Sequence, residues 1–200
     1  DDKGMALLQS TVRAVAKHGM KDVSTRSISG DAGLNDAYIY RCFRDKDDML
    51  AQAYLMENEK FMRHVMQQID QIRKQAAAFP LAERCRLVFH AAWRYLIDTP
   101  DVCRFFMYYY RSPDFKKYAQ KEYQEQMNVL AEKILNLFDS LVDAEHCLYA
   151  LFVLLNSFSL QVVNEELPDN SETESRVFNM VFSAINTQMK KEMPEETGHQ

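Results

Sequence analysis

Glycine is confined almost entirely to one end of this chain. Four of the five glycines lie within the first 33 residues, and none occurs between residues 34 and 197. Because glycine readily interrupts a helix, the region without it permits long, continuous helices. Four prolines divide that region into helix-sized pieces, at positions 80, 100, 113 and 168. No segment shows the strict alternation of a half-buried strand, so we predict an all-α fold.

The spacing of apolar residues predicts about nine helices. In chain order we expect them at residues 3–18, 25–33, 36–43, 46–76, 81–98, 100–111, 114–141, 143–166 and 172–191. Gly19 is expected to stop the first helix, since glycine adopts the left-handed conformation at little cost. Thr25 and Asp45 are expected to cap the second and fourth helices through their side-chain oxygens.

Charge is divided unevenly along the chain. The whole chain of 200 residues carries a net charge of -5. Residues 3–46 hold eight basic and four acidic side chains, a net charge of +4, and everything after residue 50 sums to -5. We therefore predict a small basic domain, residues 1–46, and a larger acidic domain, residues 47–200. A basic head of this kind suits a nucleic-acid partner.

The longest apolar run is nine residues, Cys147 to Leu155, against the roughly 20 that cross a bilayer. We therefore expect no membrane span. The N-terminus lacks a basic start followed by an apolar stretch, so we expect a cytoplasmic protein.

Residues 25 to 40 have the spacing of a helix-turn-helix, with a short helix, a turn around Gly33 and a second short helix. The seam between the two helices is expected to be apolar. The outward face of the second helix would then offer four side chains to a major groove, Asp36, Ala37, Tyr38 and Arg41. Phosphate contacts are expected from the flanks, namely Thr25, Tyr40, Arg44 and Lys46.

At these positions the sequence resembles the TetR family of bacterial transcriptional regulators. The resemblance covers about residues 5 to 54, and its motif residues are Gly19, Thr25-Arg26, Ile28, Ala32-Gly33-Leu34, Tyr40, Phe43, Lys46 and Met49-Leu50. It implies that Thr25, Tyr40 and Lys46 contact phosphates and that Arg26 and residues 36–38 meet base edges. Gly30 and Tyr38 depart from the family's usual residues, so the base preference does not transfer.

In this family the larger domain, or body, binds a small effector that changes the affinity for DNA. The body of this chain has more aromatic residues than can lie on one buried stripe of each helix. Phe105 to Tyr110, for example, is an unbroken run that includes five aromatic rings. Candidate pocket residues are Phe61, Val65, Phe89, Trp93, Phe106, Tyr109, Met127, Phe152 and Asn156. Such a pocket would suit an apolar or aromatic ligand. The alternative for each aromatic or methionine is plain core packing.

The last two predicted helices are apolar on more than one face, which indicates burial on several sides. We expect them to form a four-helix bundle with a second copy of the chain, giving a homodimer. The expected interface residues are Leu151, Leu154, Phe158, Phe178, Val181, Phe182 and Ile185. The alternative is a thick monomeric core.

Motifs of enzymes and cofactor sites are missing from the sequence: it has no glycine-rich phosphate loop, no Gly-x-Ser-x-Gly and no His-Glu-x-x-His. The four cysteines are far apart and are expected to be reduced, although Cys42 could sense oxidants. Asp143 and His146 could touch one metal ion, but no third ligand accompanies them. We expect no enzyme activity, no cofactor and no metal.

The sequence therefore predicts a dimeric repressor that leaves a palindromic DNA operator when a small, largely apolar or aromatic effector binds. The alternative is a helical carrier of apolar molecules without DNA activity.

Overall fold

The computed structural model describes residues 2–75 and 79–190, and these residues form helices and connecting turns without any strand. The N-terminal elements are α1 (Asp2–Asp22), α2 (Thr25–Asp31), η1 (Asp36–Tyr38), α3 (Ile39–Cys42) and α4 (Lys46–Arg73). The remaining elements are α5 (Leu81–Asp98), α6 (Pro100–Tyr110), α7 (Pro113–Tyr118), α8 (Gln120–Ile134), η3 (Leu135–Leu137), α9 (Leu141–Val163) and α10 (Ser171–Asn186). The predicted all-α fold is confirmed.

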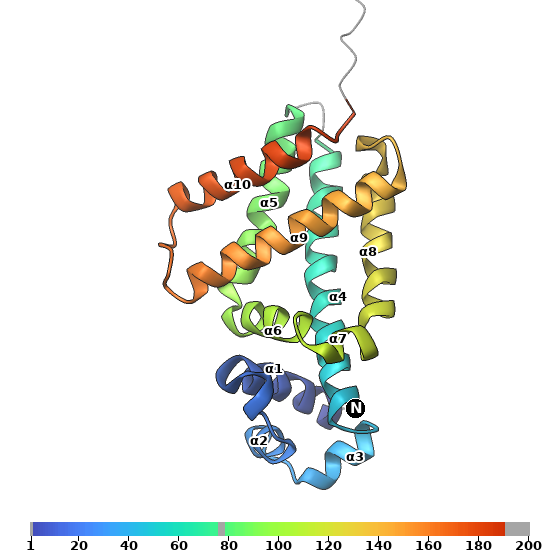
Figure 1. Ribbon diagram of the computed structural model, residues 1–200, viewed down its shortest axis with the longest axis vertical. Helices are drawn as coiled ribbons and strands as arrows, with labels where there is room; N and C mark the ends of the chain where they lie inside the picture. The colour runs from blue at the N-terminus through green and yellow to red at the C-terminus, as the bar shows by residue number, and fades with distance from the viewer. Residues whose placement is uncertain (1, 76–78, 191–200) are drawn as a thin grey trace, which may run out of the picture.

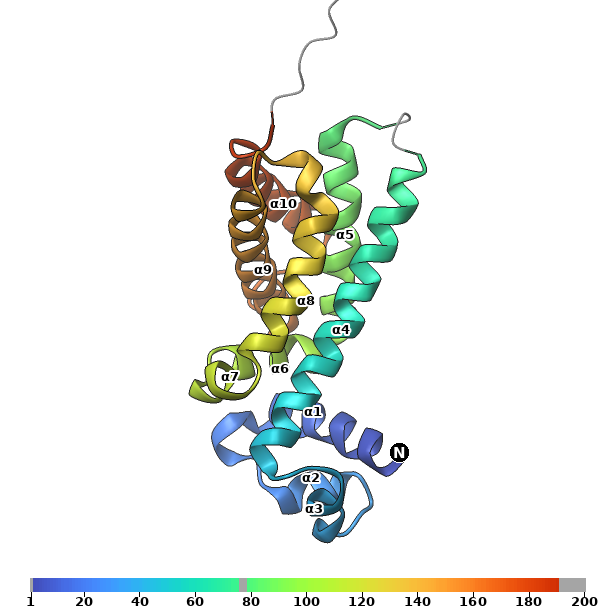
Figure 2. The ribbon, with the colours of Figure 1, turned by 90° about the vertical axis from the view of Figure 1, so that its right-hand side faces the viewer.

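A small head and a larger body share one long helix (Figure 1). The head contains α1, α2 and α3, and α4 runs from it through the length of the body. Figure 2 shows α4, α5, α8 and α9 side by side, with α6 and α7 lying across the end that faces the head. Because α6 packs against both α1 and α9, it is the layer that joins head to body. α4 begins at Lys46 and belongs to both parts, and the domain division after residue 46 stays a prediction.

The head has an apolar centre of its own. Leu7 and Val15 of α1, Ile28 of α2 and Ile39 of α3 are fully buried, and Leu50 of α4 is buried beside them in the same cluster. The seam predicted for the helix-turn-helix is therefore present at Ile28 and Ile39. Burial of these side chains sets the angle between α2 and α3.

Two helix ends differ from the sequence expectation. Ser24, and not Thr25, caps α2: its Oγ accepts the backbone N–H of Ser27 at 3.1 Å, and Ser27 Oγ accepts the N–H of Ser24 at 3.1 Å. This reciprocal pair satisfies two backbone donors, so Thr25 becomes the first helical residue. Gly19 does adopt a left-handed φ of 75°, but α1 resumes after the kink and ends at Asp22.

The long helix expected over 114–141 is three elements in the structure, α7, α8 and η3. Ala119, which separates α7 from α8, is fully buried, and Phe138 after η3 is buried too. Neither glycine nor proline marks the two breaks. The chain turns there because the free energy gained by burying Ala119 and Phe138 is larger than that of continuing the helix, so tertiary contacts override helix propensity.

The most apolar helix, α9, is central to the body. By length and composition alone it could cross a membrane. In the structure it packs against α5, α6, α8 and α10, and it buries the polar side chains of Asn156 and Ser159. These contacts identify α9 as a core helix, which agrees with the sequence expectation of no membrane span.

Candidate nucleic-acid interface and body cavity

The turn between α2 and α3 is built by a glycine and a short set of hydrogen bonds. Gly33 has a φ of 66°, a conformation that glycine adopts without a steric penalty. The N–H of Leu34 then donates to the carbonyl of Ser29 at 2.8 Å, which closes the turn. Asn35 Oδ1 accepts the N–H of Ala37 at 2.9 Å and so caps the 3₁₀ turn that begins the second helix. The expected helix-turn-helix is present, and its second helix consists of the 3₁₀ turn η1 followed by α3.

Three carboxylates of the head are engaged by hydrogen bonds within the head. Asp31 accepts from Ser10 Oγ at 2.8 Å and from Arg13 Nη2 at 2.7 Å, contacts that together lower the pKa of Asp31, Ser10 being the larger cause. Asp45 Oδ1 accepts the N–H of Asp48 at 2.8 Å and caps α4. Asp36 accepts from Ser29 Oγ across the turn. These hydrogen bonds hold the three carboxylates in fixed positions within the head, and Asp31 is also paired with the cation of Arg13.

Asp36 is a correction to the expected outward face. It was expected to meet base edges, but its carboxylate faces back toward α2 and accepts the hydroxyl proton of Ser29. The physical reason is the short turn, which places the start of the second helix within reach of α2. Asp36 thus ties the two helices together.

The other predicted contact residues remain accessible on the head. Arg26, Ala37, Tyr40 and Arg41 are exposed, and Tyr40 exposes 64% of its surface. The side chain of Arg44 is 79% exposed, although its guanidinium reaches Asp48 Oδ1 at 3.2 Å. Thr25, Tyr38 and Lys46 are half-buried.

Lys46 is anchored beside the start of α2. Its Nζ donates to the carbonyl oxygen of Val23 at 3.2 Å. This contact brings the ammonium next to Ser24 and Thr25, although Lys46 is 21 residues away from Thr25 in sequence. Two of the three phosphate contacts expected from the family resemblance therefore lie close together.

Tyr38 is held by two basic side chains. Lys3 Nζ donates to the phenol oxygen at 2.9 Å and also lies 4.1 Å from the ring centroid. The Arg41 guanidinium lies 5.1 Å from the same centroid. Lys3, as the chief cause, lowers the pKa of Tyr38. Sequence analysis counted Lys3 in the basic head but gave it no role, because only the fold brings α1 to η1.

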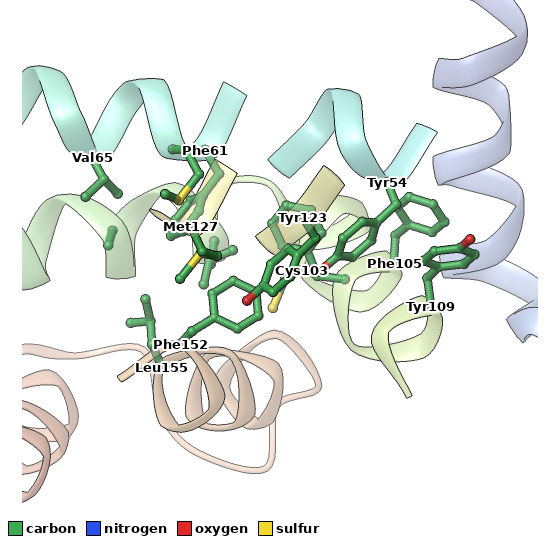
Figure 3. Packing of buried hydrophobic residues seen from close by; sticks show 14 of the residues in the cluster. Tyr54, Phe61, Val65, Cys103, Phe105, Tyr109, Tyr123, Met127, Phe152 and Leu155 are labelled. Atoms are coloured by element: carbon green, nitrogen blue, oxygen red, sulfur yellow. The ribbon is translucent and has the colours of Figure 1, made fainter. Parts of the chain in front are cut away.

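An apolar cavity of about 370 Å³, partly open to the surface, lies between α4, α5, α8, α9 and α10. Of the nine candidate pocket residues, five line it: Phe61, Val65, Phe89, Met127 and Phe152. Figure 3 shows Phe61, Val65, Met127 and Phe152 around one space, with Leu155 on its far side. Cys85 and Cys147 also line it, and burial raises the pKa of Cys85 to about 11.

The remaining four candidates lie elsewhere in the core. Trp93 packs behind Phe89, with ring centroids 5.8 Å apart. Phe106 and Tyr109 point from α6 toward Tyr54, at centroid distances of 5.5 and 5.2 Å. Asn156 donates to the carbonyl of Phe152 at 2.8 Å on its own helix. These four residues are corrected from pocket lining to core packing, because the excess aromatic surface of α6 is used between head and body.

The predicted dimer residues are also redistributed. Five of them line the cavity, namely Leu151, Phe178, Val181, Phe182 and Ile185. Phe178 and Val181 are buried within one protomer, at 4% and 1% exposure, which corrects their assignment to an interface. The reason is that α10 folds back over α5 and α9 and turns its apolar face inward. Leu154 and Phe158 stay half-exposed on α9.

No group of three metal-binding side chains occurs in residues 2–75 and 79–190. Asp143, one of the two residues considered for a metal, accepts from Ser140 Oγ at 2.7 Å at the start of α9. The four cysteines are in the thiol form, and Cys42 is half-buried.

Comparison with known proteins agrees with the geometry of the head. The model for bacterial regulatory proteins of the tetR family matches residues 7–53, which span α1 to the beginning of α4. The head of the chain thus matches the tetR family. The matched family is one of bacterial regulatory proteins, and the sequence expectation is likewise of a regulator and not of an enzyme.

The similar proteins share little sequence identity with this chain. An uncharacterized HTH-type transcriptional regulator of Haemophilus influenzae is 24% identical over 115 residues, which cover 58% of each chain. A TetR-family regulator from Marinobacter aquaeolei has a TM-score of 0.67 at 19% identity, covering 92% of this chain and 95% of that one. The regulator FadR from Bacillus subtilis, solved with stearoyl-CoA, has a TM-score of 0.68 at 18% identity, covering 90% and 97%. At these identities the likeness to the solved structures is one of fold.

Several residues that line the body cavity were missed by sequence analysis. Ile69 and Ile72 continue the α4 stripe of Phe61 and Val65, so the i, i+4 spacing could have revealed them. Arg73 and Arg84 line the cavity as well, and no pattern in the sequence pointed to them.

Proposed function

We propose that this protein is a dimeric, cytoplasmic repressor that binds a palindromic DNA operator and leaves it when a small, largely apolar effector occupies the body cavity. The observation that carries the proposal is the electrostatics of the head. Its carboxylates Asp31, Asp36 and Asp45 are engaged internally, while Arg26, Arg41 and other basic side chains stay exposed around the helix-turn-helix. An exposed cationic surface on such a motif is suited to the phosphates and major groove of DNA.

The cavity supports the effector part of the proposal. Its volume of about 370 Å³ lies within the range of small-molecule sites, and nearly all of its lining is apolar. The FadR neighbour, whose fold is similar, was solved with stearoyl-CoA, a ligand with a long apolar chain. Both observations favour an effector with an extended hydrocarbon portion over a polar metabolite.

The outer face of α9 supports a dimer. Val142 and Tyr149 are 55% and 56% exposed there, and Met180 of the neighbouring α10 is 52% exposed. Val142 and Tyr149, two helical turns apart, share an apolar side of α9 that differs from its cavity side, whereas half-exposed Leu154 and Phe158 lie roughly 120° or more round the helix. Burying the side of Val142 and Tyr149 against a second copy would place two heads on one duplex, as a palindromic operator requires.

DNA binding is tested by fluorescence anisotropy with the region upstream of the protein's own gene, across a series of salt concentrations. Lys46→Ala is expected to weaken binding about evenly for all sequences and to reduce the salt slope by about one. Tyr38→Ala is expected to change the preference among operator variants instead. Lys121→Ala, a change of an exposed lysine in the body, is the control. A protein that shows no salt-dependent binding to any palindromic segment would favour the apolar carrier.

The dimer is tested with Tyr149→Asp, which places a charge in the apolar face of α9. We expect a monomer by light scattering, because burying an unpaired carboxylate in an interface is costly. Val129→Asp is the matched control, since Val129 is 53% exposed on α8 and stands outside the proposed face. If Tyr149→Asp stays dimeric, the interface lies elsewhere.

A further inference from the structure

The first turn of α1 lies against the second helix of the helix-turn-helix. The backbone of Gly4 approaches α3 so closely that a β-carbon on Gly4 would lie 3.9 Å from Cβ of Cys42. Lys3, the preceding residue, is exposed, and its Nζ donates to the phenol oxygen of Tyr38 at 2.9 Å, from 35 residues away in sequence. The same ammonium lies 4.1 Å from the centroid of the Tyr38 ring. A side chain of α1 therefore reaches the surface that is expected to meet DNA.

These two contacts restrict the position of the Tyr38 side chain. A half-buried tyrosine has several rotamers to choose from, and each rotamer points the hydroxyl to a different place. The hydrogen bond from Lys3 fixes the phenol oxygen, and the cation–π contact fixes the face of the ring. The Arg41 guanidinium lies farther from the ring centroid, at 5.1 Å, and contributes less to the lowered pKa of Tyr38 than Lys3 does. Lys3 is thus the stronger of these two cationic partners.

The hydrogen bond from Lys3 also determines what the phenol offers to a third group. A hydroxyl has one O–H donor and two acceptor lone pairs, and the Lys3 ammonium occupies one of the lone pairs. A cationic donor polarises the O–H bond and so makes it a stronger donor, which agrees with the lowered pKa of Tyr38. Tyr38 is therefore arranged to donate. In a DNA duplex the acceptors within reach of such a donor are phosphate oxygens and the acceptor atoms of base edges.

We infer that Lys3 is a positioning residue for DNA recognition, which holds the Tyr38 hydroxyl as a hydrogen-bond donor toward the operator. The inference rests on the proposed function and adds to it a residue that lies outside the helix-turn-helix. If the hydroxyl donates to a base edge, Lys3 contributes to base preference. If it donates to a phosphate oxygen, Lys3 contributes to affinity for every sequence alike.

A double-mutant cycle tests the inference, with the full chain and the palindromic segment that the parent protein binds. Affinity is measured by fluorescence anisotropy at one salt concentration. Lys3→Gln is expected to weaken binding about fivefold in the parent protein, because Tyr38 is no longer held in place. In the Tyr38→Phe background, which lacks the hydroxyl, the same change should cost less than about twofold, as expected for the lost charge alone. Lys3→Arg keeps a cationic donor and should retain most of the affinity.

Lys21→Gln is the matched control, because Lys21 is an exposed lysine in the last turn of α1. It removes the same charge, and its effect should be equal in the parent and Tyr38→Phe backgrounds. A second measurement needs no DNA. In nuclear magnetic resonance of ring-labelled tyrosine, the signal that Tyr38→Phe removes gives the pKa of Tyr38, and Lys3→Gln should raise that pKa while Lys21→Gln leaves it unchanged.

Operator variants distinguish the two kinds of acceptor. A coupling between Lys3 and Tyr38 that changes with the base at one position assigns the hydroxyl to a base edge, and a coupling equal for all variants assigns it to a phosphate oxygen. Intact DNA binding with an additive cycle, or a pKa of Tyr38 that Lys3→Gln leaves in place, overturns the inference and leaves the proposed repressor standing. A parent protein that binds no DNA overturns the proposed function, and the inference with it.

Discussion

Two buried thiols of the body have chemistry that their surroundings determine. Cys85 and Cys103 are ordinary thiols by sequence, yet burial raises their pKa values from 9.0 to about 11 and about 12. Desolvation disfavours the thiolate, and the neighbouring cations Arg84 and Arg104 compensate for only part of that effect. Both thiols are therefore expected to be chemically inert near neutral pH.

Alkylation measures this directly. At pH 8 we expect Cys85 to react with iodoacetamide about 100-fold more slowly in the folded protein than in guanidinium chloride, following the loss of thiolate. The raised pKa values also affect the free energy of unfolding. The stabilisation from keeping both thiols protonated is fully present below about pH 9 and is lost as the pH rises toward 11 and 12. Peptide mass spectrometry gives the rate of each cysteine. Equal rates in folded and unfolded chain would contradict the burial of Cys85.

Residue-scale prediction from sequence succeeded where spacing alone decides burial and failed where packing partners decide it. Phe61 and Val65 lie one helical turn apart and share the cavity, as their spacing indicated. Asp36 was assigned to the outer face from its position in the second helix. In the structure the hydroxyl of Ser29 donates to the carboxylate of Asp36, which therefore faces α2. The sequence does not show that these two side chains are close, because the turn between them brings them together.

At the scale of elements, helix starts depend on which oxygen reaches which amide. Ser24 and Thr25 are adjacent residues with hydroxyl side chains, so sequence alone does not distinguish them as the cap of α2. In the structure only Ser24 has the extended backbone, with φ of -119° and ψ of 158°, that aims its Oγ at the N–H of Ser27. Thr25, already helical, has lost that geometry.

The two residues are therefore expected to respond differently to substitution. Ser24→Ala should lower the free energy of unfolding by about 1 kcal/mol, the usual cost of losing a cap. Thr25→Ala should change it by less than about 0.5 kcal/mol, as is usual for a substitution away from such features. Urea denaturation followed by circular dichroism gives both values. An equal or larger loss in Thr25→Ala would restore Thr25 as the cap.

Helix existence was predictable from sequence, whereas helix breaks and partners were not. Proline and glycine marked the starts of α6 and α7 and the turn at Gly33. The break at Ala119 has no such marker and depends on burial of that methyl group between neighbouring helices. Similarly, the sequence shows that α10 is apolar enough to form a dimer interface. The apolar side of α10 faces the cavity instead, because α10 packs against α5 and α9.

At the scale of the whole molecule, aromatic rings connect the cavity to the head. Phe152 lines the cavity and lies 5.7 Å from the ring of Tyr123, and Tyr123 lies 6.2 Å from Tyr54. Tyr54 in turn lies 5.2 Å from Tyr109 of α6, the helix that packs on α1. Figure 3 shows these side chains as a continuous row. Packed rings of this kind can transmit a shift of the cavity wall, because a close-packed core does not absorb it.

This row gives a prediction about coupling between effector and DNA. Tyr123→Leu should reduce the factor by which an effector with an extended hydrocarbon portion, represented by dodecanoate, changes DNA affinity, while DNA and dodecanoate each still bind the protein alone. Tyr123 stands outside the cavity lining, so the affinity for dodecanoate should change little. Phe182→Leu is the matched control, since Phe182 lines the cavity and stacks on Phe178 at 5.3 Å, away from the row.

Linkage supplies a second measurement of the same factor. If dodecanoate weakens DNA binding by some ratio, DNA must weaken dodecanoate binding by that ratio, because the coupling free energy is reciprocal. Anisotropy titrations of DNA with and without dodecanoate, and calorimetry of dodecanoate with and without DNA, should therefore agree in both the parent protein and Tyr123→Leu. A coupling factor that Tyr123→Leu leaves intact and Phe182→Leu reduces would place the route through α10 instead, because the wall that moved would then be the one that α10 supplies.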